Sequence, residues 1–391
     1  MFTAVAVFLL AAGVITSCLA LYPYICYVFH IQNIQNIQKI HTIQKTQKAP
    51  VSSKSATSTD LPQITIVINA YKEGGLVKTR VEDILNTTYP KENITLLVIN
   101  DGADEATGRA AKEILPKCPF PARLIEPKER LGKAACQNRA IEDAKTEIIV
   151  FTDADITTKP DALTRLVASL DDEKVGAASG DVQPVGKNPG VTGTESAYRS
   201  IYGRMCEYDS ALDSTYNFNG PLIAFKKAAV PAICAARGAD DANLALTCIQ
   251  NGYRAVYAAD AAAFELQPST LRAQFQQKIR RADGLVNSTR LFAKESHDLA
   301  RPFWKKTFPT RKWMILYSPV LYLITVILFA SGLFCLHIFA GTAFCVLVLL
   351  ILGFSLLFPK NMLSSFVVNQ IFLLVGLLRR KNILQWEHVD K

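Results

Sequence analysis

The chain lacks charge over two long stretches. Residues 2–29 and 314–359 contain no Asp, Glu, Lys or Arg, and only 20% of all 391 residues are charged. A typical soluble domain has about 25%. Uncharged apolar runs longer than about 18 residues are candidates for membrane-spanning helices. The two stretches therefore exclude a simple cytosolic enzyme and a disordered chain, and they leave roughly residues 58–300 for one or two globular domains.

Several site signatures are also missing. The nine cysteines form no CxxC pair, and the five histidines form no pair at the spacing of helical metal ligands. Disulfide frameworks belong mainly to small secreted domains. We therefore expect reduced, buried thiols and no zinc site. No GxGxxG fingerprint follows the first predicted strand, which ends in NAYKEGG, so a dinucleotide oxidoreductase is disfavoured.

The N-terminal part predicts one membrane span followed by a linker. Residues 1–30 are long enough for a transmembrane helix, and we interpret residues 31–62 as a basic juxtamembrane linker. Isoleucine recurs every three residues from Ile31 to Ile43, a repeat that cannot keep one apolar helix face. Several lysines precede the first acid, Asp60. The positive-inside rule then places the N-terminus outside and the following domain in the cytoplasm.

The C-terminal part, residues 301–391, predicts an interface segment, two or three transmembrane helices and a short basic tail. Lysines and arginines precede the apolar stretch, and Trp304 and Trp313 are expected to be anchors at the membrane interface. We expect a break near Ala340 and Gly341 between two spans. Residues 361–378 are apolar but shorter, so they either span the membrane, re-enter it or lie in its interface.

Residues 63–300 predict an α/β domain with a doubly wound, mainly parallel sheet. Short runs rich in Ile, Val and Leu, such as ITIVINAY, TLLVIND and EIIVFTDAD, alternate with amphipathic stretches. Ligands of such sheets bind at the carboxyl ends of the strands. The predicted strands end in polar clusters that include Glu73, Asp101 and Asp153. Any one cluster is compatible with ordinary turn chemistry, but three successive ones favour a binding site.

The pair Asp153 and Asp155 is the clearest candidate for metal binding. Two carboxylates just past a buried strand can bind Mg²⁺ or Mn²⁺ together with substrate phosphates. Such an ion neutralises the charge that develops on a departing diphosphate. Lys133 follows Gly132 at a predicted helix start and is either a phosphate contact or a solvated lysine. Asp240 and Asp241 either cap a helix or supply a general base.

At this point the order of motifs resembles the processive-type family two glycosyltransferases, which are membrane-embedded enzymes such as cellulose, hyaluronan and poly-N-acetylglucosamine synthases. The resemblance runs from about Ile64 to Leu291. It implies a GT-A domain flanked by transmembrane helices and a divalent cation, Mg²⁺ or Mn²⁺. It also implies a nucleotide-sugar donor, with UDP as the usual carrier, and a lipid-linked or growing glycan acceptor. Membrane lipid is an expected partner, and nucleic acid is not.

The resemblance also assigns expected roles to residues. Those that match the nucleotide-contacting motifs are Tyr71, Glu73, Asp101, Lys133 and Asp153. Those that match the metal-binding DxD motif are Asp153 and Asp155. Asp241 matches the catalytic base. Those that match the acceptor and diphosphate site are Gly220, Asp240, Gln277, Arg280 and Arg281.

Three departures from the family pattern matter. Asn100 stands where an Asp is common, Asp240 where Glu is usual, and Arg281 where the family has a Trp that stacks near the acceptor sugar. The predicted activity is inverting, metal-dependent transfer of a sugar at the cytoplasmic membrane face. The loss of the Trp favours a single addition, and a processive synthase that exports its polymer is the alternative. An inactive sugar-nucleotide-binding subunit is the third hypothesis.

Overall fold

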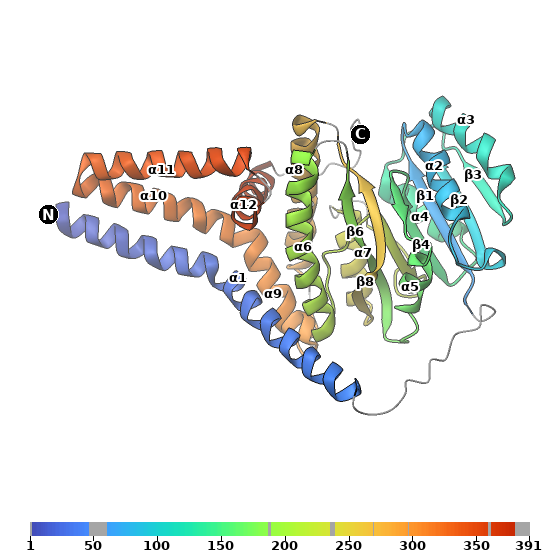
Figure 1. The fold of residues 1–391 in the computed structure, drawn as a ribbon, viewed down its shortest axis with the longest axis horizontal. Helices are drawn as coiled ribbons and strands as arrows, with labels where there is room; N and C mark the ends of the chain where they lie inside the picture. The colour runs from blue at the N-terminus through green and yellow to red at the C-terminus, as the bar shows by residue number, and fades with distance from the viewer. Residues whose placement is uncertain are drawn as a thin grey trace.

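An eight-stranded mixed sheet forms the centre of the middle domain, in the order β3-β2-β1-β4-β7-β6-β8-β5 (Figure 1). The computed structural model describes residues 2–46, 61–186, 189–234, 239–268, 270–295, 297–358 and 361–379. The strands are β1 (Ile64–Ala70), β2 (Ile94–Asn100), β3 (Ala122–Ile125), β4 (Ile148–Asp153), β5 (Ile156–Thr158), β6 (Val175–Val185), β7 (Leu222–Lys226) and β8 (Arg254–Leu266).

The sheet is doubly wound, as predicted, but it is not parallel throughout. Strands β1 to β4 are mutually parallel where they pair, whereas β7 runs antiparallel to both β4 and β6. Strand β8 is parallel to β6, and β5 is antiparallel to β8. Side chains of β1 alternate between two cores, since Ile64, Ile66 and Ile68 enter one and Val67 the other. Burial on both faces explains why these strands are continuous apolar runs.

Helices cover both faces of this sheet. Within the domain they are α2 (Gly74–Leu85), α3 (Glu105–Ile114), α4 (Lys133–Asp143), α5 (Ala162–Ala168), α6 (Pro189–Leu212), α7 (Asp240–Gln250) and α8 (Leu271–Phe292). Strand β1 lies between β2 and β4. The chain therefore adds β2 and β3 on one side of β1 and β4 on the other side. The carboxyl ends of β1 and β4 lie side by side there, with Asn69 opposite Asp153. This is the place where an open α/β sheet binds ligands.

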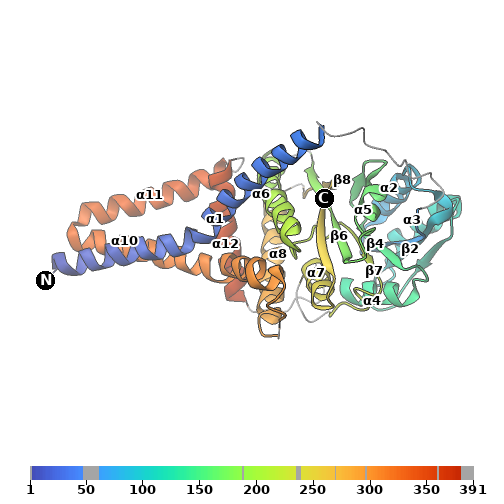
Figure 2. The ribbon, with the colours of Figure 1, turned by 90° about the horizontal axis from the view of Figure 1, so that it is seen from below.

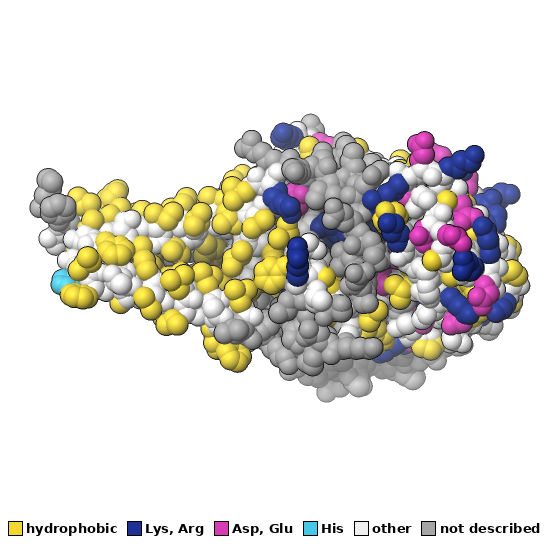
Figure 3. Space-filling model, turned by 90° about the horizontal axis from the view of Figure 1, so that it is seen from above, with side chains coloured by type: hydrophobic (Ala, Val, Ile, Leu, Met, Phe, Trp, Pro, Cys, Tyr) yellow, Lys and Arg dark blue, Asp and Glu magenta, His cyan; other side chains and the backbone are white. Residues whose placement is uncertain are grey.

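Three helices are long and apolar enough to cross a membrane, within the described part of the chain. They are α1 (Phe2–Thr46), whose apolar part is Thr3–Phe29, the run Phe303–Leu336, and α11 (Ile338–Leu357). The run Phe303–Leu336 begins with a π-helical segment, Phe303–Thr307, and continues through α9 (Phe308–Lys312), a second π-helical segment, Trp313–Tyr317, and α10 (Ser318–Leu336). The helices project from the domain as a bundle (Figure 1), and its surface is covered by hydrophobic side chains (Figure 3).

Two predicted boundaries in the helical region differ from the structure. The first helix does not end near residue 30 but continues to Thr46, so the isoleucine repeat is helical even without a constant apolar face. The rest of the predicted linker and the basic tail lie outside the described residues. The break between α10 and α11 falls at His337 rather than at Gly341. The extended backbone of His337 ends α10, and its side chain accepts a hydrogen bond from Phe339 N at 3.2 Å.

The segment left open by the sequence forms α12 (Met362–Arg379). Figures 1 and 2 agree that α12 crosses the ends of α10 and α11, between the bundle and the domain. It packs closely on α8, because a Cβ at Gly376 would lie 3.1 Å from the backbone of Ala282 and Asp283. Helix α12 is therefore a wall of the domain that runs across the bundle rather than along it.

Residues predicted to mark the membrane interface are partly buried inside the protein instead. Trp304 is 4% exposed and stacks on His297 at 3.8 Å between ring centroids, so it is a core residue and not an anchor. Arg301 Nη2 binds Asp213 Oδ1 at 2.8 Å. Arg311, on α9, is also buried, and its Nη2 binds Asp209 Oδ2 of α6 at 2.7 Å. These two arginines are internal ion-pair partners rather than interface charges, because the domain supplies acids opposite them.

The pair Arg311 and Asp209 ties the bundle to the domain, since Tyr27 of α1 also donates to Asp209 Oδ1 at 2.7 Å. We expect Asp209→Ala to lower the free energy of unfolding by about 3–5 kcal/mol, because it leaves a buried cation without its carboxylate. Denaturant unfolding of the purified protein measures this. The control is Glu105→Ala, which removes an exposed ion pair with Arg109 and should cost less than about 1 kcal/mol. Equal losses in the two variants would contradict the anchoring role.

Candidate active site

One cleft of about 320 Å³ lies at the carboxyl ends of β1 and β4. It is lined by every residue for which the sequence predicted a site role, namely Tyr71, Glu73, Asp101, Lys133, Asp153, Asp155, Gly220, Asp240, Asp241, Gln277, Arg280 and Arg281. These residues come from both halves of the domain and span more than 200 positions of the chain. The sheet and α8 therefore bring the predicted motifs together in space.

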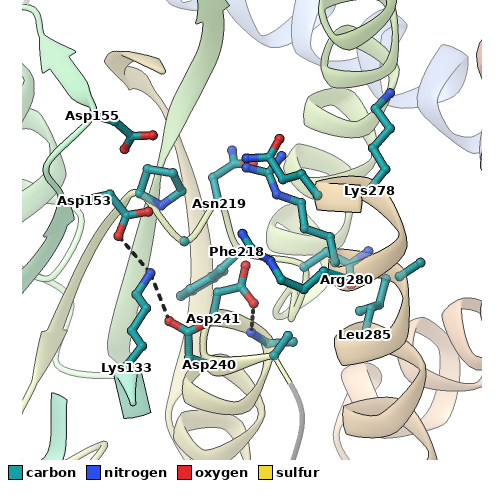
Figure 4. Close-up of a pocket in the computed structure, with 18 of the residues that line it drawn as sticks. Lys133, Asp153, Asp155, Phe218, Asn219, Asp240, Asp241, Lys278, Arg280 and Leu285 are labelled. Atoms are coloured by element: carbon teal, nitrogen blue, oxygen red, sulfur yellow. Dashed lines mark hydrogen bonds and ion pairs between the residues drawn. The ribbon is translucent and has the colours of Figure 1, made fainter. Parts of the chain in front are cut away.

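Lys133 links the two acidic motifs. Its Nζ lies 2.8 Å from Asp153 Oδ1 and 3.3 Å from Asp240 Oδ2 (Figure 4). Burial lowers the pKa of Lys133, but the charges of Asp153, Asp240 and Asp241 outweigh burial and raise it overall. Lys133 is therefore a fully charged contact between β4 and α7, and the alternative of a solvated surface lysine is wrong. Gly132 precedes it with φ +89°, a conformation that favours glycine.

The two acids of α7 have different surroundings. Asp240 accepts from Gln137 Nε2 at 3.2 Å besides its contact with Lys133, so it faces α4 and does not cap its own helix. Asp241 Oδ1 accepts from Ala242 N at 2.7 Å. Burial and the nearby charge of Asp240 raise the pKa of Asp241 to about 6. Asp241 can thus exchange a proton near neutral pH, which suits a general base.

Asp101 and Asn100 fix the backbone beside the cleft. The Asp101 carboxylate accepts from Leu131 N at 2.7 Å and from Gly132 N at 2.9 Å, which holds the loop that leads into α4. Asn100 does not line the cleft. Its Nδ2 donates to Asp104 O at 2.8 Å and to Glu126 Oε1 at 3.1 Å. An Asp at position 100 could not make these donor contacts, so the departure from the family pattern has a local structural reason.

Near the ends of β1 and β4 the cleft has an aromatic part and an acidic part. The Arg130 guanidinium lies 3.8 Å from the centroid of the Tyr71 ring. Asp155 follows β4 and is 5% exposed. No group of three or more His, Cys, Asp or Glu side chains that could hold a metal occurs among the described residues. Asp153 and Asp155 fit a hard cation that takes its other ligands from a diphosphate and water.

Cations gather on the opposite side of the cleft. Figure 4 shows Arg280 on α8 reaching toward Asp241, whereas Lys278 of the same helix points away from the carboxylates. Burial and the adjacent charge of Arg281 lower the pKa of Arg280. The largely buried guanidinium of Arg280 would gain from an anionic ligand. Basic side chains therefore line both sides of the cleft, with Arg130 and Lys133 on the sheet side and Arg280 and Arg281 on α8.

The sequence interpretation missed several lining residues. Arg199 and Tyr202 come from α6, and Asn217 from the loop before β7. Helix α12 contributes an apolar wall with Val368, Phe372 and Leu373. The sequence gives one signal for α12, which is the pair of polar residues at 369 and 370 inside an apolar stretch. Its position against α8 depends on tertiary packing and leaves no local signal.

The region that is similar to known proteins contains every site residue that the sequence predicted. The family model described as glycosyltransferase like family 2 matches residues 62–284. The chain is 24% identical over 243 residues to the probable glycosyltransferase YdaM of Bacillus subtilis. It is 25% identical over 234 residues to a poly-beta-1,6-N-acetyl-D-glucosamine synthase of Staphylococcus aureus. Each match covers 58% of this chain, and the matches cover 56% and 55% of the relatives, so the chain spans about half their length.

A solved structure resembles nearly the whole chain. It is a mannosyltransferase from Pyrobaculum calidifontis in complex with GDP-Man and Mn²⁺, with a TM-score of 0.72 and 24% identity over 97% of this chain and 100% of that one. This similarity shows that the middle domain has the GT-A-like fold. Because the family model covers more than half of the chain, this chain belongs to the glycosyltransferase like family 2.

Proposed function

We propose that the protein is an inverting glycosyltransferase that moves a sugar from a nucleoside-diphosphate sugar, expected to be a UDP-sugar, to a hydroxyl of a lipid-linked glycan. The observation that supports this most is the convergence of the DxD pair and Asp241 on one cleft, with Lys133 between them. The spanning helices and the basic residues after residue 30 support a multi-pass membrane protein, with its N-terminus outside and its catalytic domain in the cytoplasm.

The donor occupies the sheet side of the cleft. Tyr71 and Arg130 offer flat surfaces for the nucleobase, and Asn69 adds amide atoms that are buried and have no hydrogen-bond partner in the described part of the chain. Asp153 and Asp155 would hold Mg²⁺ or Mn²⁺ together with the diphosphate, and the ion would neutralise charge on the leaving group. The complex of the structural neighbour with GDP-Man and Mn²⁺ supports this donor class and this cation.

Asp241 is the group that moves the proton. Its carboxylate takes the proton from an acceptor hydroxyl, and the oxygen attacks the anomeric carbon from the face opposite the diphosphate. The bond between the anomeric carbon and the diphosphate oxygen breaks, and the nucleoside diphosphate leaves. One base is sufficient because no covalent intermediate forms. Gly220 gives Asp241 room, since a Cβ there would lie 3.3 Å from Asp241 Oδ2.

The acceptor side favours a lipid-linked molecule and a single addition. Val368, Phe372 and Leu373 of α12 form an apolar wall next to the bundle. Helix α10 packs closely against α1, because a Cβ at Gly332 would lie 2.9 Å from Leu10 Cγ. Three closely packed spans leave little room for a polysaccharide channel. The apolar wall instead offers a surface for the lipid part of an acceptor.

A processive synthase is the second candidate function. It is favoured by the similarity to a poly-beta-1,6-N-acetyl-D-glucosamine synthase, although the chain covers only 55% of that relative. The two functions differ in their products. A ladder of products from labelled donor would indicate polymerisation, whereas a single shifted lipid would indicate one addition.

A screen of sugar nucleotides against the full-length protein in membranes tests the proposal. We expect UDP or GDP release from one donor class, dependent on Mn²⁺ or Mg²⁺, and abolished by EDTA. The control is Asp155→Asn, which should lose metal dependence together with release. Absence of binding and release with all sugar nucleotides would contradict the enzymatic proposal and favour an inactive subunit.

A further inference from the structure

Arg281, which stands where the family has a Trp, is a half-exposed member of an ion-pair cluster whose other members, Glu265 and Arg199, are buried. Its Nη2 donates to Glu265 Oε1 at 2.6 Å, and Arg199 Nη2 donates to Glu265 Oε2 at 2.5 Å. The two arginines thus use both oxygens of one carboxylate. Glu265 lies in β8 and is 2% exposed, whereas α6 and α8 supply the arginines. The cluster therefore joins three elements at one wall of the cleft.

Arg199 and Arg281 both line the cleft, and Glu265 sits behind them. Arg199 is 6% exposed and also donates through Nη1 to Val182 O at 2.9 Å and to Asn219 Oδ1 at 3.3 Å. These contacts fix the Arg199 guanidinium before any ligand arrives. Fixed guanidinium groups bind the oxygens of phosphate in pairs with little further loss of side-chain entropy.

We propose that Arg199 and Arg281, held in place by Glu265, bind a phosphate group of the acceptor. The acceptor is then a sugar linked through phosphate to a lipid, with a free sugar hydroxyl as the nucleophile. This inference rests on the proposed function and specifies its acceptor.

The rest of the acceptor side fits such a molecule. Leu285 of α8 and the apolar wall of α12 line the cleft beside the arginines and suit a lipid chain. Asn217 Oδ1 and Ser365 Oγ are buried, line the same cleft and have no hydrogen-bond partner within the described ranges. They offer contacts for the hydroxyls of a sugar. A sugar, a charged link and an apolar tail thus each find matching side chains.

The proposed donor side is formed by β4, α4 and α7, whereas the cluster comes from β8, α6 and α8. The two sides adjoin at Asp155, because Glu265 pairs with Ile156 of β5 and Leu266 N donates to Asp155 O at 3.0 Å. The charge of Arg281 nevertheless reaches the base, since it lowers the pKa of Asp241. An acceptor phosphate on Arg281 would therefore bring the attached sugar near Asp241, where its hydroxyl is activated.

Binding of farnesyl phosphate and of farnesol to the full-length protein in nanodiscs tests this proposal. Calorimetry would be done with and without saturating Mn²⁺ and nucleoside diphosphate, either UDP or GDP. For the wild type we expect farnesyl phosphate to bind at least about tenfold more tightly than farnesol. Arg281→Ala and Arg281→Trp should reduce this ratio at least about fivefold without changing farnesol affinity, and Arg281→Lys should retain part of it. Arg272→Ala, an exposed arginine of the same helix, is the control.

Three results would overturn the proposal. They are equal binding of the two lipids by the wild type, equal weakening of both lipids in Arg281→Ala, and displacement of farnesyl phosphate by the nucleoside diphosphate. The last would place the lipid phosphate in the donor subsite. Nucleotide binding is measured in the same samples, and its absence in the wild type would contradict the proposed function instead. Retained nucleotide binding in each variant shows that the variant is folded.

Discussion

Replacement of Asp241 by Asn is expected to reduce sugar transfer about a thousandfold, within the range of about 10²–10⁴ that general bases contribute. Asparagine keeps the shape of the side chain but cannot accept the proton of the acceptor hydroxyl. Nucleotide affinity should change less than about twofold, because the groups proposed to hold the nucleotide and the metal lie at or just after the ends of β1 and β4 and around the start of α4, not on α7. Steady-state transfer and calorimetric nucleotide binding measure the two effects.

A control variant and a stability measurement make this result specific to Asp241. Asp171→Asn changes an exposed acid far from the cleft and should leave transfer unchanged. Asp241→Asn should also raise the melting temperature at neutral pH, since a carboxylate whose pKa is raised to about 6 destabilises the folded state when it ionises. Near-wild-type turnover in Asp241→Asn would show that Asp241 is not the catalytic base.

The second large effect is a pH dependence that belongs to Asp241. Its pKa of about 6 predicts that kcat/KM at limiting donor falls about tenfold for each pH unit below about pH 6, where the base is protonated. Burial and Asp240 raise this pKa, whereas Arg281 lowers it. Asp240→Asn should therefore shift the low-pH fall of kcat/KM, the acidic limb of the pH–rate profile, to lower pH. Arg281→Ala should shift it to higher pH.

The direction of these shifts is the diagnostic quantity. Asp240 and Arg281 both line the cleft, so both variants are expected to have a lower kcat/KM at all pH values. Only the pH at which kcat/KM begins to fall reports on the pKa of Asp241. Rate profiles between about pH 5 and 8 at constant ionic strength give that position. Shifts of the same sign in both variants would show that another group controls the limb.

The motifs near strand ends were readable from the sequence because their chemistry is local. Asp153 and Asp155 follow a buried strand, and Gly132 and Lys133 begin a helix. Parallel strands then bring their carboxyl ends to one edge of the sheet. Periodicity and strand-end chemistry were therefore sufficient to anticipate that these residues line one cleft, on the side where we propose that the donor binds.

The acceptor side was harder to predict because it depends on contacts between distant elements. Glu265 lies in a strand whose sequence gives no sign of an ion pair. Its partners Arg199 and Arg281 are 66 and 16 positions away in the sequence. Whether a basic residue near an apolar stretch faces lipid or an internal acid is likewise invisible locally. Arg311 illustrates this, since Asp209, 102 positions earlier, makes it an internal ion-pair partner.

We propose that the donor, the metal and the base share the cleft at the ends of β1 and β4. A structure of the full-length protein with a hydrolysis-resistant sugar nucleotide and Mn²⁺ tests it most directly. We expect the metal on Asp153 and Asp155, the nucleobase beside Tyr71 and Arg130, and the anomeric carbon facing Asp241. A nucleotide bound outside this cleft, or an anomeric carbon turned away from Asp241, would contradict it.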